Sequence, residues 1–489
     1  MDLFLLLPIL APLAAAALAA VLGWRRLTAV VTVLAALSVL VSSAVLGFGP
    51  GPGTRFALGS LLRADALTVT MLIVIGTVGT LATWAGVGYI DAELAHRHTD
   101  QKGANLYGVL VPIFLAMMAL AVLANNIGVM WVAIEATTVA TAFLVGHRRT
   151  RAALEATWKY VVICSVGIAL AFLGTVLIYF VSLHAGATSG DALNIDVLLA
   201  HAGDLDPAVT RLAAGLLLLG YGAKAGLVPF HTWLADAHSQ APAPVSALMS
   251  GVLLSVAFSV LLRVKSVVDL AVGIEFMRTG LLIIGLLTLL IAASLLVVQT
   301  DFKRMLAYSS MENMGLVAVA AATGTRLAIA ALLLHVLAHG VGKTLVFLGS
   351  GQIQAAHDST RISDVTGVLA RSPMIGVTFL TGLAVLLGLP PFAMFASELS
   401  ISRALADANL GWALGAALFF VVVAFAALVR NGSRMLLGPA DPGAPAITVP
   451  RPVAGALVTG VVLSLVLGLT IGPLLEIFQS AGTVLGGAR

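Results

Sequence analysis

Long apolar runs dominate the chain, and short polar segments separate them. Most runs reach the roughly 20 residues that an α-helix needs to cross a bilayer. By this criterion we count about 14 spans. Their approximate ranges are 2–23, 28–48, 65–90, 105–124, 128–146, 153–181, 209–235, 242–263, 275–299, 303–322, 326–352, 373–402, 411–437 and 451–478. The pattern predicts an all-α, polytopic membrane protein in which residues 1–489 form one integral membrane domain.

Composition supports this interpretation. The chain is 60% hydrophobic and 10% charged, whereas soluble proteins carry about 25% charged residues. The net charge of +4 comes from basic residues in many short loops, so it does not indicate a nucleic-acid partner. No basic segment precedes the first apolar run, so we interpret that run as a transmembrane helix and not as a cleaved signal peptide.

The basic residues also predict the orientation. One set of alternate loops is richer in Lys and Arg and contains the cluster HRRTR at 147–151. The longest loop on the other side, 182–206, holds four aspartates (Asp191, Asp196, Asp204 and Asp206) and no Lys or Arg. Because basic loops face the cytoplasm, we expect both chain ends to lie outside, in a plasma (inner) membrane.

Two spans are interrupted in the same style. The span 209–235 contains KAGLVPFHTWL with Pro229, and the span 373–402 contains LLGLPPFAMFASEL with Pro390 and Pro391. Proline removes a backbone donor and breaks the helix. Matching breaks in two halves of a transporter point to an ion site. The alternative, ordinary proline kinks, is common in membrane helices.

The breaks lie five helices apart, and an odd offset turns the second copy upside down. We therefore expect helices 4–8 (105–263) and helices 9–13 (271–437) to be inverted repeats, with helices 7 and 12 broken. Residues 1–104 form helices 1–3 in this scheme, and residues 451–489 hold the C-terminal helix.

Several charged residues stand inside apolar segments, where each costs roughly 3 kcal/mol or more. Glu135 and Lys224 are each alone in such a segment, which favours an ion pair between helices that responds to protonation. Thr138, one turn from Glu135, could hydrogen-bond it. Lys159 follows Glu155 by four residues, so a local ion pair is the alternative to a place in a proton pathway.

His335, His339 and Lys343 recur every four residues and form one stripe on a helix face. Histidine donates and accepts protons near neutral pH, so the stripe predicts a proton relay. Glu398 follows the second break and could be the terminal carboxylate. Asp236 and His238 in WLADAHSQAP could form an entry point, and helix capping and packing is the alternative.

Other chemistry is absent from the sequence. The single cysteine, Cys164, excludes a cysteine metal cluster, and lysine beside the two histidines argues against a metal site. We find no phosphate-binding loop and no dinucleotide fingerprint. We therefore expect no cofactor, no metal and no redox centre in this chain.

Four long motifs resemble the proton-translocating membrane subunits shared by complex I, Mrp-type antiporters and membrane-bound hydrogenases. They are GYGAKAGLVPFHTWLADAHSQAPAPVSALMSGVLL, DFKRMLAYSSMENMG, HVLAHGVGKTLVFLGSG and LPPFAMFASEL. The segment WVAIEATTVATAFLVGHRRTRAALEATWKYVVICSVGIAL is most similar to hydrogenase-4 component F. The resemblance covers nearly the whole chain, most clearly 105–398.

This resemblance implies a 14-helix core with two inverted five-helix units. It places the coupling pair on Glu135 and Lys224, and the relay histidines on His335 and His339. The exit residue falls on Glu398. Where many members carry a lysine or histidine in helix 8, this chain has Ser255, so water held by Ser255 would have to bridge the two halves.

The expected function is proton translocation through buried Glu, Lys and His residues, as a subunit of a redox-driven complex of hydrogenase-4 or NADH:quinone oxidoreductase type. The alternative is a subunit of an Mrp-type cation/proton antiporter driven by an ion gradient. A purely structural scaffold conflicts with this many intramembrane charges. Expected partners are other membrane subunits of the same superfamily, through them a hydrophilic redox module, and the lipid bilayer.

Overall fold

The computed structural model describes residues 2–49, 53–438 and 447–486. Met1 and residues 487–489 lie outside these ranges. The prediction that both chain ends face outward therefore falls outside the described residues. Eleven of the described helices are long and apolar enough to cross a membrane. The chain is therefore a helical, multi-span membrane protein, as the hydrophobic pattern predicts.

The helices run in the following order. They are α1 (Asp2–Leu22), α2 (Arg26–Phe48), α3 (Ala66–Ala95), α4 (Gln101–Leu123), α5 (Ile127–Val145), α6 (Arg151–His184), α7 (Ile195–Ala200), η1 (Ala202–Asp204), α8 (Pro207–Lys224), α9 (Trp233–Gln240), α10 (Ala243–Leu248), η2 (Met249–Leu253), α11 (Leu254–Val272), α12 (Ile274–Val297), α13 (Phe302–Thr323), α14 (Arg326–His357), η3 (Ile362–Asp364), α15 (Val368–Arg371), α16 (Pro373–Leu386), α17 (Ala393–Asp407), α18 (Gly411–Leu437), α19 (Arg451–Leu469) and α20 (Gly472–Gly486).

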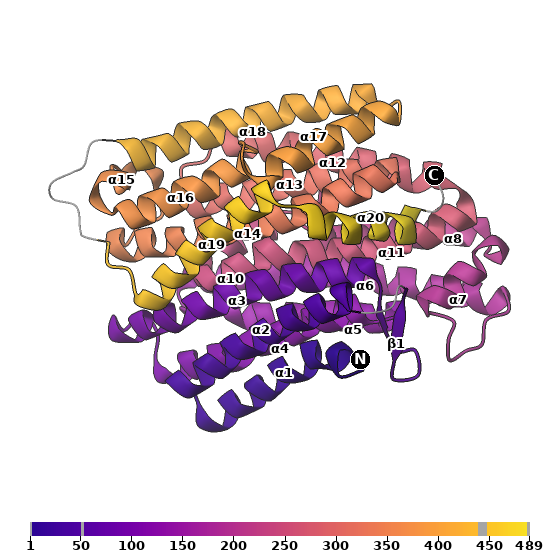
Figure 1. The fold of residues 1–489 in the computed structure, drawn as a ribbon, viewed down its shortest axis with the longest axis horizontal. Coiled ribbons are helices and arrows are strands. Elements are labelled where there is room, and N and C mark those ends of the chain that lie inside the picture. The colour runs from indigo at the N-terminus through magenta and orange to yellow at the C-terminus, as the bar shows by residue number, and fades with distance from the viewer. Residues whose placement is uncertain (1, 50–52, 439–446, 487–489) are drawn as a thin grey trace.

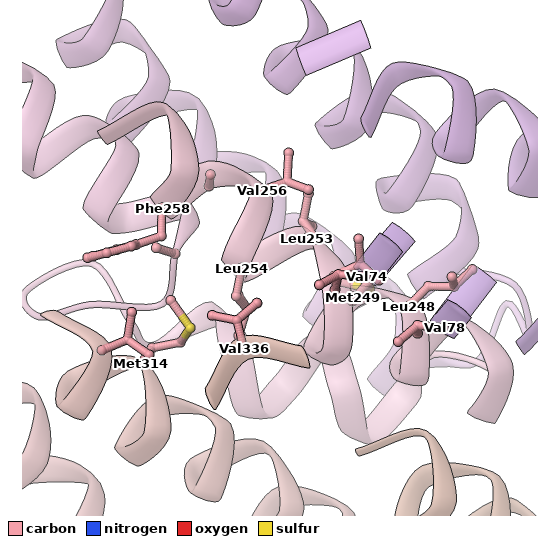
Figure 2. Close-up of a cluster of buried hydrophobic side chains, with 14 of the residues drawn as sticks. Val74, Val78, Leu248, Met249, Leu253, Leu254, Val256, Phe258, Met314 and Val336 are labelled. Carbon is pink, nitrogen blue, oxygen red and sulfur yellow. The ribbon is translucent and has the colours of Figure 1, made fainter. Parts of the chain in front are cut away.

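Three helical segments form the centre of the bundle: α3, α14 and the continuous run α10–η2–α11. Figure 1 shows them between α1, α2 and α4 on one side and α16, α17 and α18 on the other. Figure 2 shows the contact itself, where Leu254 and Phe258 of α11 lie near Val336 of α14 and Met314 of α13. The outer helices expose apolar side chains such as Val21 and Phe419, which is the pattern expected for faces in lipid.

A pair of glycines allows the backbones of η2 and α14 to approach closely within this centre. A Cβ on Gly251 of η2 would lie 3.1 Å from the Gly340 carbonyl oxygen, and one on Gly340 of α14 would lie 3.0 Å from the Gly251 oxygen. Side chains at either position would force the two backbones apart. The contact holds the stripe of titratable groups on α14 against the middle of the molecule, because Gly340 follows His339 directly.

The two interruptions that the sequence predicts have the same backbone structure. After α8, the amides of Ala225, Gly226 and Leu227 donate to carbonyls four, three and five residues earlier, and after α16 those of Leu387, Gly388 and Leu389 do the same. The glycine of each set is left-handed, with φ of 77° at Gly226 and 60° at Gly388. This is the Schellman ending, in which glycine stops a helix and satisfies its last carbonyls.

Two connecting loops also pair with helix starts in the same way. Asn126, the N-cap of α5, forms an antiparallel bridge with Asn194, and Asp301, the N-cap of α13, forms one with Arg361. In both cases the side chain of the cap accepts from the first turn of its own helix. Figure 1 places the loop with α7 at one end of the bundle and the loop with α15 at the opposite end.

Three expectations need correction. The chain is not entirely α-helical, because β1 (Arg55–Ala57) and β2 (Leu62–Ala64) form a short antiparallel hairpin. The last span does not continue to 478, because α19 ends at Leu469 and α20 starts at Gly472. Gly468 there lies against the second helix break, where a Cβ would come within 1.8 Å of the Pro391 carbonyl oxygen.

The third correction concerns the span expected to end at 263. It continues as α11 to Val272, so Arg263 and Lys265 are helical and buried, not loop residues. Arg263 donates to both carboxylate oxygens of Asp65 at 2.8 and 2.9 Å, and Lys265 pairs with Asp269. A charge can be buried when it is paired and hydrogen-bonded, which explains how these residues continue the helix.

Candidate functional site

Lys224 ends α8 and points into the protein. Its side chain is almost fully buried, with 2% of the residue exposed. The ammonium donates to Thr138 Oγ1 at 2.8 Å and to the Tyr160 hydroxyl at 2.5 Å, and it lies 4.7 Å from the centre of the Tyr160 ring. Because α8 ends at Lys224 and the left-handed Gly226 follows, Lys224 sits at the break itself. Its position depends on the local backbone as well as on its partners.

Glu135 does not contact Lys224. Among the described residues no ion pair joins the two, although Glu135 Oε2 is buried and has no hydrogen-bond partner. The expected bond between Thr138 and Glu135 is also absent, because Thr138 accepts from Lys224 and lies 3.4 Å from the Ile134 carbonyl oxygen. Lys224 therefore contacts α5 at Thr138, one turn away from Glu135 on the same helix.

The hydroxyls around Lys224 form a chain with a fixed direction. Because Thr141 has a single hydroxyl proton and donates it to the Thr137 carbonyl, the Tyr160 hydroxyl, 2.5 Å away, donates to Thr141 while it accepts from Lys224. Thr141 in turn donates to the Thr137 carbonyl at 2.6 Å. Tyr160 and Thr141 were not among the residues singled out from the sequence, because a neutral hydroxyl inside an apolar helix gives no pattern that marks it.

Lys159 lies apart from this buried group. Its side chain is 47% exposed and pairs with Glu155 at 2.6 Å and with Asp236 at 3.1 Å. Asp236 also pairs with Arg304 at 2.7 Å. The structure thus brings Lys159 and Asp236 together in an ionic network at one end of α6 and α9, and the local pair with Glu155 is present as well.

His238, two residues beyond Asp236, is fully buried. It stacks on Phe347 with ring centres 5.3 Å apart and lies 6.4 Å from the Trp233 ring. Neither ring nitrogen has a hydrogen-bond partner. A buried imidazole without partners is costly, so the site favours water next to this ring.

The stripe on α14 is completely buried, and its three members have different partners. His335 contacts Asn313 Oδ1 through Nε2 at 2.9 Å and Ser397 Oγ through Nδ1 at 3.0 Å. Lys343 donates to the Leu306 carbonyl at 2.7 Å and to Ser309 Oγ. His339 Nε2 has no partner. Helix α13 therefore supplies most of the polar contacts of the stripe.

Glu312 of α13 is a buried carboxylate that sequence reasoning missed. Its Oε2 accepts from the Asn313 side chain at 2.7 Å, and the residue is 6% exposed. The signal was present, because Glu312 stands in the middle of the span 303–322. The same span starts at Lys303, which is buried and donates to the Ala241 carbonyl at 2.9 Å.

Glu398 follows the second break on α17. Its carboxylate lies over Gly388, where a Cβ would come within 2.3 Å of Oε2. The side chain also lines a small cavity of about 20 Å³ between α13, α17 and α18. A cavity of this size can hold one water molecule. Glu398 is therefore placed beside both the break and a space suited to water.

Buried polar atoms without partners occur in both groups and on α9 and α11. In the described part of the chain they include Glu135 Oε2, Ser255 Oγ, both ring nitrogens of His238, and His339 Nε2. Buried polar groups are almost always hydrogen-bonded to protein or to ordered water. Ser255 Oγ, where we expect water to bridge the two halves, belongs to this set, and the bridge stays a prediction. No three His, Cys, Asp or Glu side chains of the described residues converge as metal ligands.

Outside the membrane spans, electrostatic effects are strong at Asp65 and at His147. Burial alone would raise the pKa of the Asp65 carboxyl, but the charges of Arg263 and Arg63 and the bond to Arg263 hold that pKa well below its usual range. Burial lowers the pKa of His147, in the loop before α6, to about 4. Asp65 thus stays ionised and caps α3, while His147 is neutral at physiological pH.

Comparison with known proteins identifies the relatives of this architecture. A family model described as NADH:quinone oxidoreductase/Mrp antiporter, TM, matches residues 124–424. A hydrogenase-4 component F homolog from Methylacidiphilum infernorum is 36% identical over 358 residues, covering 72% of this chain and 74% of that protein.

Two solved structures share the fold. A chain of a membrane-bound sulfane sulfur reductase, an archaeal respiratory membrane complex, superposes with a TM-score of 0.88 at 24% identity, covering 99% of this chain and 98% of that chain. A chain of respiratory complex I from Thermus thermophilus superposes with a TM-score of 0.75 at 26% identity, covering 95% and 98%.

Proposed function

Because the chain belongs to the NADH:quinone oxidoreductase/Mrp antiporter family, we propose that it is the proton-translocating membrane subunit of a redox-driven complex of hydrogenase-4 or NADH:quinone oxidoreductase type. The observation that carries this proposal is the interior of the bundle. Lys224, His339 and Lys343 are buried there with hydroxyls, carbonyls and unpartnered polar atoms, and with few direct counter-charges.

We also propose about 14 membrane crossings with two inverted five-helix units. The number is reached by adding α13 and the two interrupted pairs, α8 with α9 and α16 with α17, to the 11 long apolar helices. The matching Schellman endings and the matching Asn126–Asn194 and Asp301–Arg361 bridges support the repeat. The bridges lie at opposite ends of the bundle, as an inverted copy requires (Figure 1).

The proposed route runs through both units. Protons enter at the end that carries Lys159 and Asp236, and Glu135 and Lys224 form the first exchange site. Water near Ser255 and His238 connects this site to His339 and Lys343. His335 and Glu398 lie at the second break and form the exit. By the distribution of basic loops, the exit faces outward, and so do both chain ends.

The partners in this proposal are other membrane subunits of the same superfamily and, through them, a hydrophilic module that carries the redox centres. Groups with convergent carboxylates and carbonyls suit sodium, whereas the lysines and histidines here exchange protons. This difference favours protons as the transported ion.

The test compares two lysines in the complete complex, reconstituted in vesicles. Lys343→Ala removes a buried amine of the route, and Lys102→Ala removes an exposed amine at the start of α4 as the matched control. Redox-driven proton uptake, followed with a pH-sensitive dye, should fall at least about tenfold only in Lys343→Ala, because a positioned proton-transfer group contributes that much or more. Normal uptake in an assembled Lys343→Ala complex would refute the route.

The same vesicles discriminate the antiporter alternative. A sodium gradient without redox substrate should move no protons through the wild-type complex. Proton movement driven by that gradient alone, and lost in Lys343→Ala, would instead assign the chain to an antiporter.

A further inference from the structure

The contacts of Asn313 determine which nitrogen of His335 carries a proton. The Asn313 amide nitrogen donates to the Ser309 carbonyl at 2.6 Å and to Glu312 Oε2 at 2.7 Å. A backbone carbonyl can only accept, so the amide nitrogen must face Ser309 and the amide oxygen must face His335. That oxygen lies 2.9 Å from His335 Nε2 and can only accept. Nε2 is therefore the protonated nitrogen in neutral His335.

The opposite nitrogen meets a group that can change its role. Ser397 Oγ lies 3.0 Å from His335 Nδ1 and 2.7 Å from the Met394 carbonyl oxygen. A hydroxyl has one proton and can also accept. When His335 is neutral, Ser397 donates to Nδ1. When His335 is protonated, Nδ1 donates to Ser397, and Ser397 donates to the Met394 carbonyl.

Both protonation states of His335 are thus fully hydrogen-bonded. The gain of one proton at Nδ1, together with a rotation of the Ser397 hydroxyl, converts the first arrangement into the second. This property is unusual in a buried site, where an unsatisfied donor or acceptor costs roughly 1–3 kcal/mol. Asn313 cannot follow such a change, because the Ser309 carbonyl and Glu312 hold its amide. The two ring nitrogens therefore have different roles: Nε2 keeps its proton, and Nδ1 can gain or lose one.

We infer that Asn313 is a positioning residue that keeps the proton on His335 Nε2 and confines proton gain and loss to Nδ1, on the side of Ser397 and α17. The inference rests on the proposed function for its purpose, because proton transfer through His335 gives the arrangement its use. It goes beyond that function in assigning a direction. His335 exchanges protons toward the break of α16 and α17, and not toward Glu312.

The placement of Ser397 supports this direction. Ser397 lies in the first turns of α17 and precedes Glu398, the proposed exit residue. Glu312 is on the other side of Asn313, and its carboxylate contacts the amide of Asn313 and not the imidazole. Asn313 therefore separates a buried acid from the ring as well as orienting the ring.

The first test is spectroscopic and does not depend on transport. The full-length chain, labelled with ¹⁵N-histidine and reconstituted in lipid, is measured by solid-state NMR. The chain has 10 histidines, and His335→Gln identifies the signals of His335 by their loss. At a pH where His335 is neutral, we expect a protonated Nε2 and an unprotonated Nδ1. A protonated Nδ1 in the neutral ring would overturn the inference.

Two variants then separate positioning from packing. Asn313→Leu keeps a similar volume but removes the acceptor, so the His335 signals should show both tautomers. Asn431→Leu, at another buried asparagine on α18, is the matched control and should leave them unchanged. A single Nε2-protonated form in a folded Asn313→Leu chain would show that Asn313 does not set the tautomer.

A transport measurement tests the direction in which His335 exchanges protons. Ser397→Ala leaves Nδ1 without its partner, and Ser397→Thr restores a hydroxyl. In the complete complex, proton uptake should fall about tenfold in Ser397→Ala, equivalent to about 1.4 kcal/mol in the barrier, and recover in Ser397→Thr. Equal loss in both variants would overturn the role of Nδ1. If the tautomer result holds while the wild-type complex moves no protons, the proposed function fails and the assignment of the nitrogens stands.

Discussion

The site around Lys224 and the site around Lys343 hold the same kind of buried cation in different surroundings. Lys224 bonds to two side-chain hydroxyls, and the nearby carboxylate of Glu135 has an oxygen without a partner. Lys343 bonds to a carbonyl and a hydroxyl, within a larger group that includes Glu312, His335 and His339. The first site is sparse, and the second is a network.

The difference has a functional consequence. In a sparse site one group carries each step, so the loss of that group leaves nothing to replace it. In a network, neighbouring titratable groups and water can take over part of the transfer. We therefore expect the loss of Lys224 to have a larger effect on transport than the loss of any single group in the second site.

The largest effect should come from Lys224→Ala. Proton uptake by vesicles with the complete complex should fall about a hundredfold, within the range that a positioned acid or base contributes. Glu135→Ala should cost about tenfold, and the double variant should cost no more than Lys224→Ala alone, because residues of one unit are not additive. If the double loss equals the product of two independent losses, Glu135 and Lys224 do not act together.

An intermediate effect is expected at the exit of the network. Glu398→Gln keeps the shape of the side chain over Gly388 and removes its titration. The complex should assemble and retain redox turnover, with fewer protons moved per turnover, since expelling a proton against 100 mV requires about 2.3 kcal/mol. Simultaneous recording of redox rate and proton release measures this ratio. A normal ratio in Glu398→Gln would place the exit at another group.

The sequence was sufficient for the features that local signals encode. Glycine and proline marked both helix breaks, and isolated charges inside apolar runs marked side chains that the fold buries, such as Lys224, His335 and Lys343. Their role in transport stays a prediction. Buried hydroxyls and amides such as Tyr160 and Asn313 were missed, because their importance arises only when helices far apart in the chain pack together.

The remaining errors have the same origin. The buried position of Lys303 depends on the Ala241 carbonyl, and that of Arg263 depends on Asp65. A charge near the end of an apolar run looks like a loop residue until its partner is known. The end of α19 at Leu469 likewise coincides with its contact with the break at Pro391, which no local pattern could reveal.

The smallest effect, and the sharpest test of the sparse site, concerns Tyr160. Tyr160→Phe removes one of the two hydroxyl acceptors that hold Lys224 away from Glu135. The lost hydrogen bond contributes about 1 kcal/mol. Transport alone should change only a few-fold. Lys224 should then depend more on Glu135, so Glu135→Ala should cost more in the Tyr160→Phe background than in the wild type. Tyr179→Phe, on the same helix but without a hydrogen bond to Lys224, serves as the control. The measurement is the initial rate of proton uptake in the wild type, the two single variants and the double variant. An identical cost of Glu135→Ala in both backgrounds would mean that the hydroxyls around Lys224 only fill space. The approach of Lys224 to Glu135 would then be governed by the helix break at Gly226.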